Sequence, residues 1–142
     1  MIYLLDTDHI SLVQRGSGAA YATLMSHISQ HALTDIAFSI ISMHEQVLGC
    51  HTYINRARTR HDVIEGYEML AQVLQDFSAV HVLPFDEAAA VIFDELATQR
   101  LRIGRMDLRI ASIALSRGMV LVTRNARDFG QVPDLQLEDW TI

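Results

Sequence analysis

Four acidic residues fall where the ends of parallel strands and the starts of neighbouring helices would bring them together. They are Asp6, Glu45, Asp107 and Asp128. Two ionised carboxylates about 4 Å apart repel each other by roughly 4 kcal/mol at an effective dielectric constant of 20. Such a group stays ionised only where a cation neutralises it, and otherwise binds protons. The acids therefore predict a metal site, provided that the fold brings them together.

The available ligand types indicate which ion such a site would bind. The chain has one cysteine, Cys50, and no two of its histidines have a recognisable zinc spacing. Oxygen-only ligands favour a hard ion, Mg²⁺ or Mn²⁺. An open carboxylate site for such an ion is typical of phosphodiester hydrolysis, in which the metal polarises the phosphate and stabilises the leaving oxygen. We expect the histidines to be surface or half-buried residues rather than ligands.

Short apolar runs alternate with amphipathic segments along the chain. The runs expected to form strands are 2–5, 36–40, 80–83 and 119–123, with a short edge strand within 131–140. The segments expected to form helices are 9–14, 19–31, 42–55, 62–77, 86–101 and 107–117. This alternation predicts an α/β fold, a three-layer sandwich with a mainly parallel central sheet of about 4–5 strands flanked by helices.

The stretch 104–129 sets the position of two of the acids. A helix over 107–117 rises about 16 Å, and after a glycine turn a strand over 119–123 returns over about the same length. Asp107 should therefore lie level with Asn125 and Asp128, at the carboxyl edge of the sheet, where α/β proteins bind ligands. Right-handed crossover connections place the other two acids at the same edge.

Each acid also has a simpler structural explanation. Asp6 could end a strand and cap a helix, and the Ser-x-x-Glu spacing that ends at Glu45 fits a capping box. Asp107 could stabilise a helix dipole. Asn125 and Asp128 could bond to their own turn backbone. The prediction of a shared site rests on the convergence of all these residues.

Length and composition limit the class of protein. With 142 residues and a mass of 16.0 kDa, we expect a single domain covering residues 1–142. Half of the residues are hydrophobic, yet no apolar run approaches the roughly 18 residues of a membrane span. The start MIYLLD lacks the features of a signal peptide. The lone cysteine fits a reducing cytosol, so we expect a cytoplasmic protein that does not associate with membranes.

The charge distribution is uneven. The formal net charge is −6, and all 11 basic residues are arginines. Two groups stand out: Arg56, Arg58 and Arg60, and then Arg100, Arg102, Arg105 and Arg109. Guanidinium groups suit phosphate recognition through planar, bidentate contacts. A composition bias with solvated helix faces explains the same pattern, and the sequence leaves both interpretations open.

Four segments of the chain resemble PIN-domain ribonucleases, and specifically VapC-type toxins of bacterial toxin–antitoxin pairs. They are YLLDTDHIS, ISMHEQVLG, IGRMDLRIASIALSRG and LVTRNARDFGQVPDLQLEDW. They follow the order of the family and span nearly the whole chain. The resemblance implies a PIN domain with Mg²⁺-dependent endoribonuclease activity on RNA, often structured tRNA or rRNA. It also implies inhibition by a cognate antitoxin protein.

The family's motif positions coincide with the acids. Its first three acids fall on Asp6, Glu45 and Asp107, and its polar motif at a strand end falls on Thr123, Asn125 and Asp128. We expect Asp6, Asp107 and Asp128 to hold the metal directly or through water. Glu45 would be a further ligand or a general base that orients water. The residues expected to hydrogen-bond the carboxylates or the scissile phosphate are Thr7, Thr123 and Asn125.

The share of Asp128 is the least secure of the four, because some relatives carry an acid where this chain has Asn125. A homodimer is also expected, as is an antitoxin that inserts a helix and a basic side chain near the acids. The apolar stripe of the helix 62–77 would suit either partner.

Two other classes of protein compete with this interpretation. The sequence Asp6-Thr7-Asp8-His9-Ile10 after an apolar strand is similar to the signature of haloacid-dehalogenase-type phosphatases. Those enzymes usually need a lysine beside the phosphoaspartate, and this chain has none. The second class is a binding protein with a PIN fold whose main task is to dock a partner. An RNA-cleavage assay separates the nuclease from the binding protein.

Overall fold

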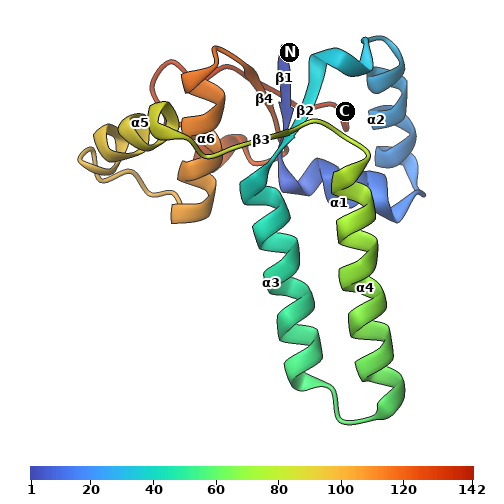
Figure 1. The fold of residues 1–142 in the computed structure, drawn as a ribbon. Coiled ribbons are helices and arrows are strands. Elements are labelled where there is room, and N and C mark those ends of the chain that lie inside the picture. The colour runs from blue at the N-terminus through green and yellow to red at the C-terminus, as the bar shows by residue number, and fades with distance from the viewer.

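The computed structural model describes residues 1–142 and contains one five-stranded sheet (Figure 1). The strands are β1 (Tyr3–Leu5), β2 (Ile36–Ser39), β3 (Val82–Leu83), β4 (Val120–Val122) and β5 (Leu137–Glu138). Their order is β3-β2-β1-β4-β5, and every neighbouring pair is parallel. The mainly parallel sheet predicted from the sequence is confirmed, and it is parallel throughout.

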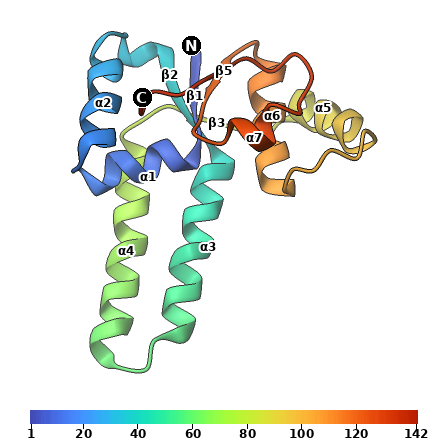
Figure 2. The same ribbon diagram turned by 180° about the vertical axis from the view of Figure 1, so that it is seen from behind.

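Helices cover both faces of the sheet. They are α1 (Thr7–Arg15), α2 (Ala19–Ser29), α3 (Ile40–Arg56), α4 (Arg60–Ser78), α5 (Glu87–Ala97), α6 (Arg105–Ser116) and α7 (Ala126–Phe129), with a 3₁₀ turn at Leu33–Asp35. Helices α5 and α6 lie on one side of the sheet, and α1 and α2 lie on the other (Figures 1 and 2). Two separate hydrophobic clusters fill these layers. The predicted three-layer sandwich is confirmed, and no helix is long and apolar enough to cross a bilayer.

Helix α6 and strand β4 lie in the centre of the molecule, as their apolar sequence requires. Ile110, Ile113 and Leu121 are fully buried, and the turn between the two elements contains Gly118 at φ +62°. The helix begins at Arg105, two residues earlier than predicted. The preceding residue, Gly104, takes the cap position with extended backbone, and no side chain caps the helix.

The start of α3 settles one alternative left open by the sequence. Its cap is Ser39, whose hydroxyl accepts a hydrogen bond from the backbone N–H of Ser42. The helix therefore begins before Ser42, and the capping-box explanation of Glu45 is wrong. The carboxylate of Glu45 instead bonds to another segment of the chain, as described below.

Helices α3 and α4 form a hairpin that projects from the rest of the molecule (Figure 1). With 17 and 19 residues, the two helices are about 25 and 28 Å long. The apolar stripe predicted on α4 is only partly covered: Phe77 is buried, but Tyr67 is 57% exposed and Leu74 is 69% exposed. On α5, Leu96 is buried, whereas Val91 is 48% exposed.

Two glycines in this hairpin allow a matched test of its packing. A Cβ atom at Gly66 would lie 2.5 Å from Cγ1 of Ile54, whereas a Cβ at Gly49 would meet nothing within 4 Å. Gly66→Val should therefore lower the free energy of unfolding by about 1–3 kcal/mol through overpacking. Gly49→Ala should raise it by about 0.5–1 kcal/mol through helix propensity. Urea denaturation measures both, and equal effects of the two changes would contradict this packing.

Candidate active site

Asp6 lies at the end of β1 and is held on both carboxylate oxygens. Its Oδ1 accepts the backbone N–H of Thr7 at 2.8 Å, and its Oδ2 accepts the hydroxyl of Thr123 at 2.8 Å. The residue is 5% exposed. Burial, and then the charges of Asp8 and Asp107, raise its pKa to about 7, although the two hydrogen bonds oppose this. Asp6 also caps α1, so its structural and chemical roles coincide.

A chain of hydroxyl groups joins the start of α1 to the start of α3. The hydroxyl of Thr7 donates to Oε1 of Glu45 at 3.0 Å and lies 2.8 Å from that of Ser42. A hydroxyl has one hydrogen, so Ser42 must donate to Thr7, and Ser39 in turn donates to Ser42 at 3.3 Å. Burial, and then the charge of Asp107, raise the pKa of Glu45. No protein group donates to Oε2 of Glu45, which is left for a ligand.

Asp107 and Asp128 complete the predicted set of acids. Asp107 lies half-buried in the first turn of α6, where burial and the charges of Asp128 and Asp8 raise its pKa. Asn125 orients Asp128: its Nδ2 donates to Oδ2 at 3.1 Å, and its Oδ1 accepts the backbone N–H of Asp128 at 3.3 Å. The charge effects among Asp6, Glu45, Asp107 and Asp128 show that these acids lie near one another at the edge expected from the sequence; this group of acids is called the pocket below.

Asp8 is a fifth acid of the pocket that the sequence analysis did not assign to it. Its Oδ2 accepts the backbone N–H of Arg124 at 2.9 Å, which ties the end of β1 to the end of β4. Burial would raise the pKa of Asp8, but hydrogen bonds from His9 and from the Arg124 N–H outweigh it and lower the pKa. Asp8 is therefore ionised more readily than an ordinary aspartate. The signal in the sequence was the Asp-x-Asp spacing directly after a strand.

His9 is fully buried, contrary to our expectation for the histidines. Its Nδ1 lies 2.7 Å from Oδ1 of Asp8, and its Nε2 accepts the backbone N–H of Trp140 at 3.2 Å. Because Nε2 accepts, the geometry assigns the ring proton to Nδ1, which donates to Asp8. The imidazole thus links the carboxyl end of the chain to the acids and is not free to bind a metal.

The acids are too widely spaced for three of them to enclose a bare ion. No three of them place their oxygens all within 4.8 Å of one another; the one group of side chains that does so is His61, Asp62 and Glu65 at the hairpin tip. Mg²⁺ usually retains several waters and takes one or two carboxylates together with substrate phosphate oxygens. An open, oxygen-only arrangement therefore suits Mg²⁺ or Mn²⁺ better than a dry, tightly coordinating site or zinc.

The raised pKa of Asp6 predicts a dependence of stability on pH. Its pKa rises from 3.8 to about 7 on folding, so the ionised form costs stability. The cost is absent below the unfolded pKa, grows as the pH rises, and is complete above about pH 7. In metal-free buffer, the free energy of unfolding of Asp6→Asn, relative to that of the wild type, should therefore rise by about 2 kcal/mol when the pH is raised from 5 to 8.

Urea denaturation at the two pH values measures this difference. The exposed Asp134 provides the control, because Asp134→Asn should show no such trend. If the free energies of unfolding of Asp6→Asn and the wild type differed by the same amount at both pH values, the raised pKa of Asp6 would be contradicted.

Comparisons with known proteins identify relatives that span the chain. A scan with models of protein families finds no match. The ribonuclease VapC1 of Haemophilus influenzae strain R2866 is 30% identical over 145 residues, which cover 99% of each chain. The tRNA(fMet)-specific endonuclease VapC of Salmonella typhimurium is 33% identical over 109 residues, or 74% of this chain and 75% of that protein. Its counterpart from Shigella flexneri is 43% identical over 83 residues, or 56% of each.

Solved structures agree with these relatives. VapBC-1 from nontypeable Haemophilus influenzae matches with a TM-score of 0.77 and 27% identity over the whole of both chains. DNA-bound VapBC from Salmonella typhimurium matches with a TM-score of 0.75 and 26% identity, over 99% of this chain and 98% of that chain. Both the order of the motifs and the fold are therefore those expected from the sequence. With full-length relatives of this kind and acids gathered at one sheet edge, the chain belongs to the VapC family, the ribonuclease toxins of VapBC toxin–antitoxin systems.

Proposed function

We propose that this VapC chain is a Mg²⁺-dependent endoribonuclease that hydrolyses RNA phosphodiester bonds, with Mn²⁺ as an alternative ion. The observation that carries the proposal is the convergence of five carboxylates at the carboxyl edge of the sheet. The pKa values of Asp6, Glu45 and Asp107 are all raised, by burial and then by neighbouring negative charge. A divalent cation relieves this repulsion, and RNA phosphates supply further oxygen ligands.

In this proposal, three of the acids hold the ion and the fourth positions the attacking water. Asp6, Asp107 and Asp128 would hold the ion directly or through water. Bound there, Mg²⁺ supplies positive charge to the phosphate and to the leaving oxygen. Glu45 would orient the attacking water and accept its proton on Oε2, because Oε1 is occupied by Thr7.

The surrounding polar groups keep these carboxylates in place. Thr123 fixes Asp6, and Asn125 fixes Asp128. The phosphoaspartyl alternative fits the structure poorly, since both oxygens of Asp6 already accept hydrogen bonds and the chain has no lysine to neutralise a phosphoaspartate.

The proposed substrate is a structured RNA such as tRNA, because the relatives from Salmonella and Shigella are named as endonucleases specific for tRNA(fMet). Such a substrate places the protein in the cytoplasm. The single cysteine is a buried free thiol, which fits a reducing compartment.

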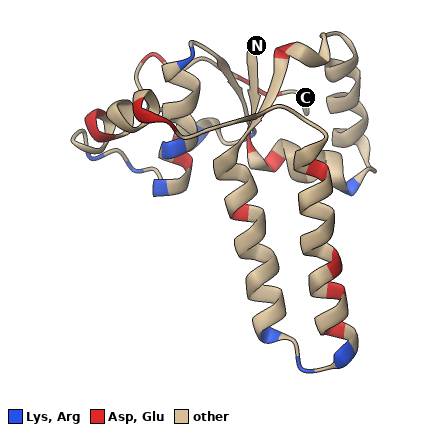
Figure 3. Cartoon of the chain, in the orientation of Figure 1, with Lys and Arg blue, Asp and Glu red and all other residues tan.

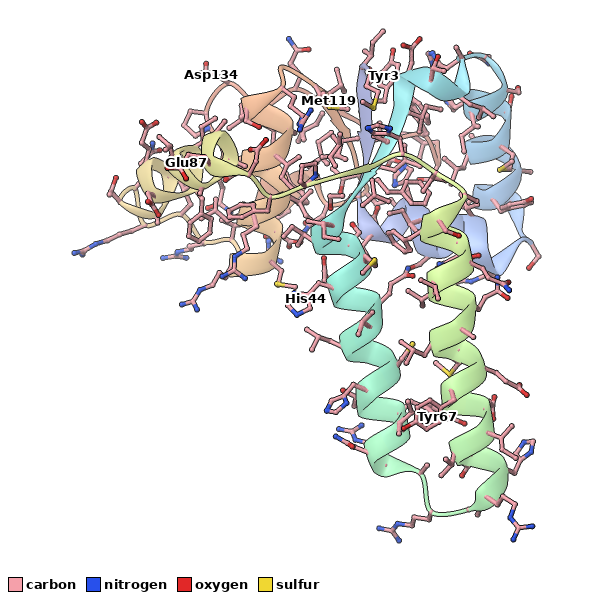
Figure 4. All side chains as sticks on the ribbon, viewed as in Figure 1. Tyr3, His44, Tyr67, Glu87, Met119 and Asp134 are labelled. Atoms are coloured by element: carbon pink, nitrogen blue, oxygen red, sulfur yellow. The ribbon has the colours of Figure 1, made fainter.

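Loss of one acid should remove cleavage without unfolding the protein. Asp107→Asn should lower the rate of Mg²⁺-dependent cleavage of tRNA by at least about 100-fold, because a charged group at the reaction centre is lost. Asp134→Asn is the matched control: Asp134 is exposed at a turn with φ +65°, which asparagine tolerates, and Figure 4 shows it far from the pocket edge. Chelation should abolish wild-type activity, and undiminished cleavage in excess chelator would refute the mechanism.

The partner proposed for this chain is an antitoxin protein that lies along the hairpin. A groove of about 380 Å³ between α3 and α4 is lined only by hydrophobic residues: Met43, Val47, Tyr67, Leu70, Ala71, Val73 and Leu74. Figure 4 shows the ring of Tyr67 between the two helices. Met43 lies two residues before Glu45 in α3, so one end of the groove is at the same level along this helix as Glu45, near the base of the hairpin. An amphipathic helix could fill the groove and direct a basic side chain to the acids.

A charge in this groove should weaken inhibition but not catalysis. Leu74→Asp is expected to reduce the affinity for the cognate antitoxin about tenfold or more, because an apolar contact becomes a buried carboxylate. Val91→Asp, at a similarly exposed apolar position on α5, serves as the control. Calorimetric titration measures the affinities, and the RNA-cleavage rate of both variants should equal that of the wild type. Equal affinity of Leu74→Asp and Val91→Asp would place the antitoxin elsewhere.

A homodimer is also proposed for the free chain, and sedimentation equilibrium of the purified protein tests it directly.

A further inference from the structure

The arginines at the hairpin tip have no structural task in the folded chain. Arg56, Arg58 and Arg60 are exposed, and none lies within 4.0 Å of a carboxylate oxygen. The one arginine that forms an ion pair is Arg117, with Asp86. Figure 3 shows the three tip arginines in blue at the end of the hairpin, where α3 passes into α4. These exposed and unpaired guanidinium groups are available to bind an anionic ligand.

Helix geometry connects one of these arginines with the pocket. Arg56 follows Glu45 by 11 residues, which is slightly more than three turns of 3.6 residues. The two residues therefore share one face of α3, about 16 Å apart along the helix axis. His44, beside Glu45, projects from α3 into the open angle between the hairpin and the α5–α6 layer (Figure 4).

The surface between Glu45 and Arg56 is open. On the same face lie Gly49, where a Cβ would meet nothing within 4 Å, and Thr52, whose hydroxyl donates to the carbonyl of Leu48. A hollow of about 300 Å³ ends this track at the tip; its lining is Gly49, Thr52, Tyr53, Arg56, Ala57 and Asp62. The small residues Gly49 and Thr52 thus leave room for a strand along this face of α3.

We propose that Arg56 binds a phosphate of the RNA substrate about five nucleotides from the scissile bond, so that the hairpin acts as a second anchor for the substrate. This inference rests on the proposed ribonuclease function. A stacked strand advances about 3.4 Å per nucleotide, so five nucleotides span the 16 Å along α3. The planar guanidinium group of Arg56 can donate two parallel hydrogen bonds to the oxygens of one phosphate.

Two acids near the tip weaken the attraction of this region for nucleic acid in general. Asp62 lines the far wall of the hollow on α4, and Glu65 accepts the hydroxyl of Tyr53 at 2.8 Å. Their negative charge opposes indiscriminate binding of polyanions. An RNA already held at the pocket can still reach Arg56, whereas free nucleic acid gains little at the tip alone. Short RNAs that do not extend to the tip cannot use the anchor.

The test compares two RNAs that share one cleavage site, mapped first in total tRNA. The long RNA is a hairpin that extends at least about ten nucleotides beyond the site on each side, and the short one extends about two. Arg56→Ala should raise KM for the long RNA about threefold to tenfold and leave kcat unchanged. The slope of log(kcat/KM) against log salt should become less steep by about one. The short RNA should be cleaved equally by Arg56→Ala and the wild type.

Arg15→Ala is the matched control, because Arg15 is an exposed arginine at the end of another helix, α1. It should change neither KM, and unchanged thermal unfolding of both variants shows that they fold. Equal effects of Arg56→Ala on the two RNAs, or none on the long RNA, would overturn the anchor alone. Weaker antitoxin binding with an unchanged KM would assign Arg56 to the protein partner and also overturn it. A wild-type chain that cleaves neither RNA would remove the proposed function and the anchor together.

Discussion

Repulsion between carboxylates at one edge of the sheet is the constraint on which the rest of this structure depends. Five acids lie near one another, and burial raises the pKa of three of them, Asp6, Glu45 and Asp107. The pKa of Asp6 reaches about 7 even though two hydrogen bonds stabilise its ionised form. The fold therefore holds a group of charges that is unfavourable in the absence of a cation. Burial of the large apolar clusters on both faces of the sheet offsets the free energy that the buried acids cost.

Two threonine hydroxyls organise the acids. Thr7 connects the end of β1 with Glu45 on α3, and Thr123 connects the end of β4 with Asp6. Because Thr123 is almost fully buried, its hydroxyl donates to Asp6 in surroundings of low polarity, where a hydrogen bond is electrostatically stronger than in water. Asp6 and Glu45 are thus each positioned by a neighbour from a different segment. This arrangement explains how residues scattered along the chain can keep a geometry suited to one ion.

The fold and the four predicted acids could be read from the sequence because both follow from periodicity. Apolar runs and helix lengths alone put Asp107 level with Asp128. What the sequence could not provide depends on side-chain direction. Asp8 and His9 have the pattern of a helix start. In the short helix α1, however, Asp8 points toward the other acids and His9 points into the core. The stripe on α4 was recognised, but periodicity does not tell whether another part of the chain covers it, and Tyr67 and Leu74 remain exposed.

The bond between Asp6 and Thr123 joins residues 117 positions apart, and the contact of His9 with Trp140 spans 131 positions. A ribosome makes the first partner of each pair early and the second only at the close of synthesis. Contacts of such long range form late in folding. The nascent chain consequently carries an unfinished group of acids until its last residues emerge, so these acids cannot act together while the chain is still attached to the ribosome.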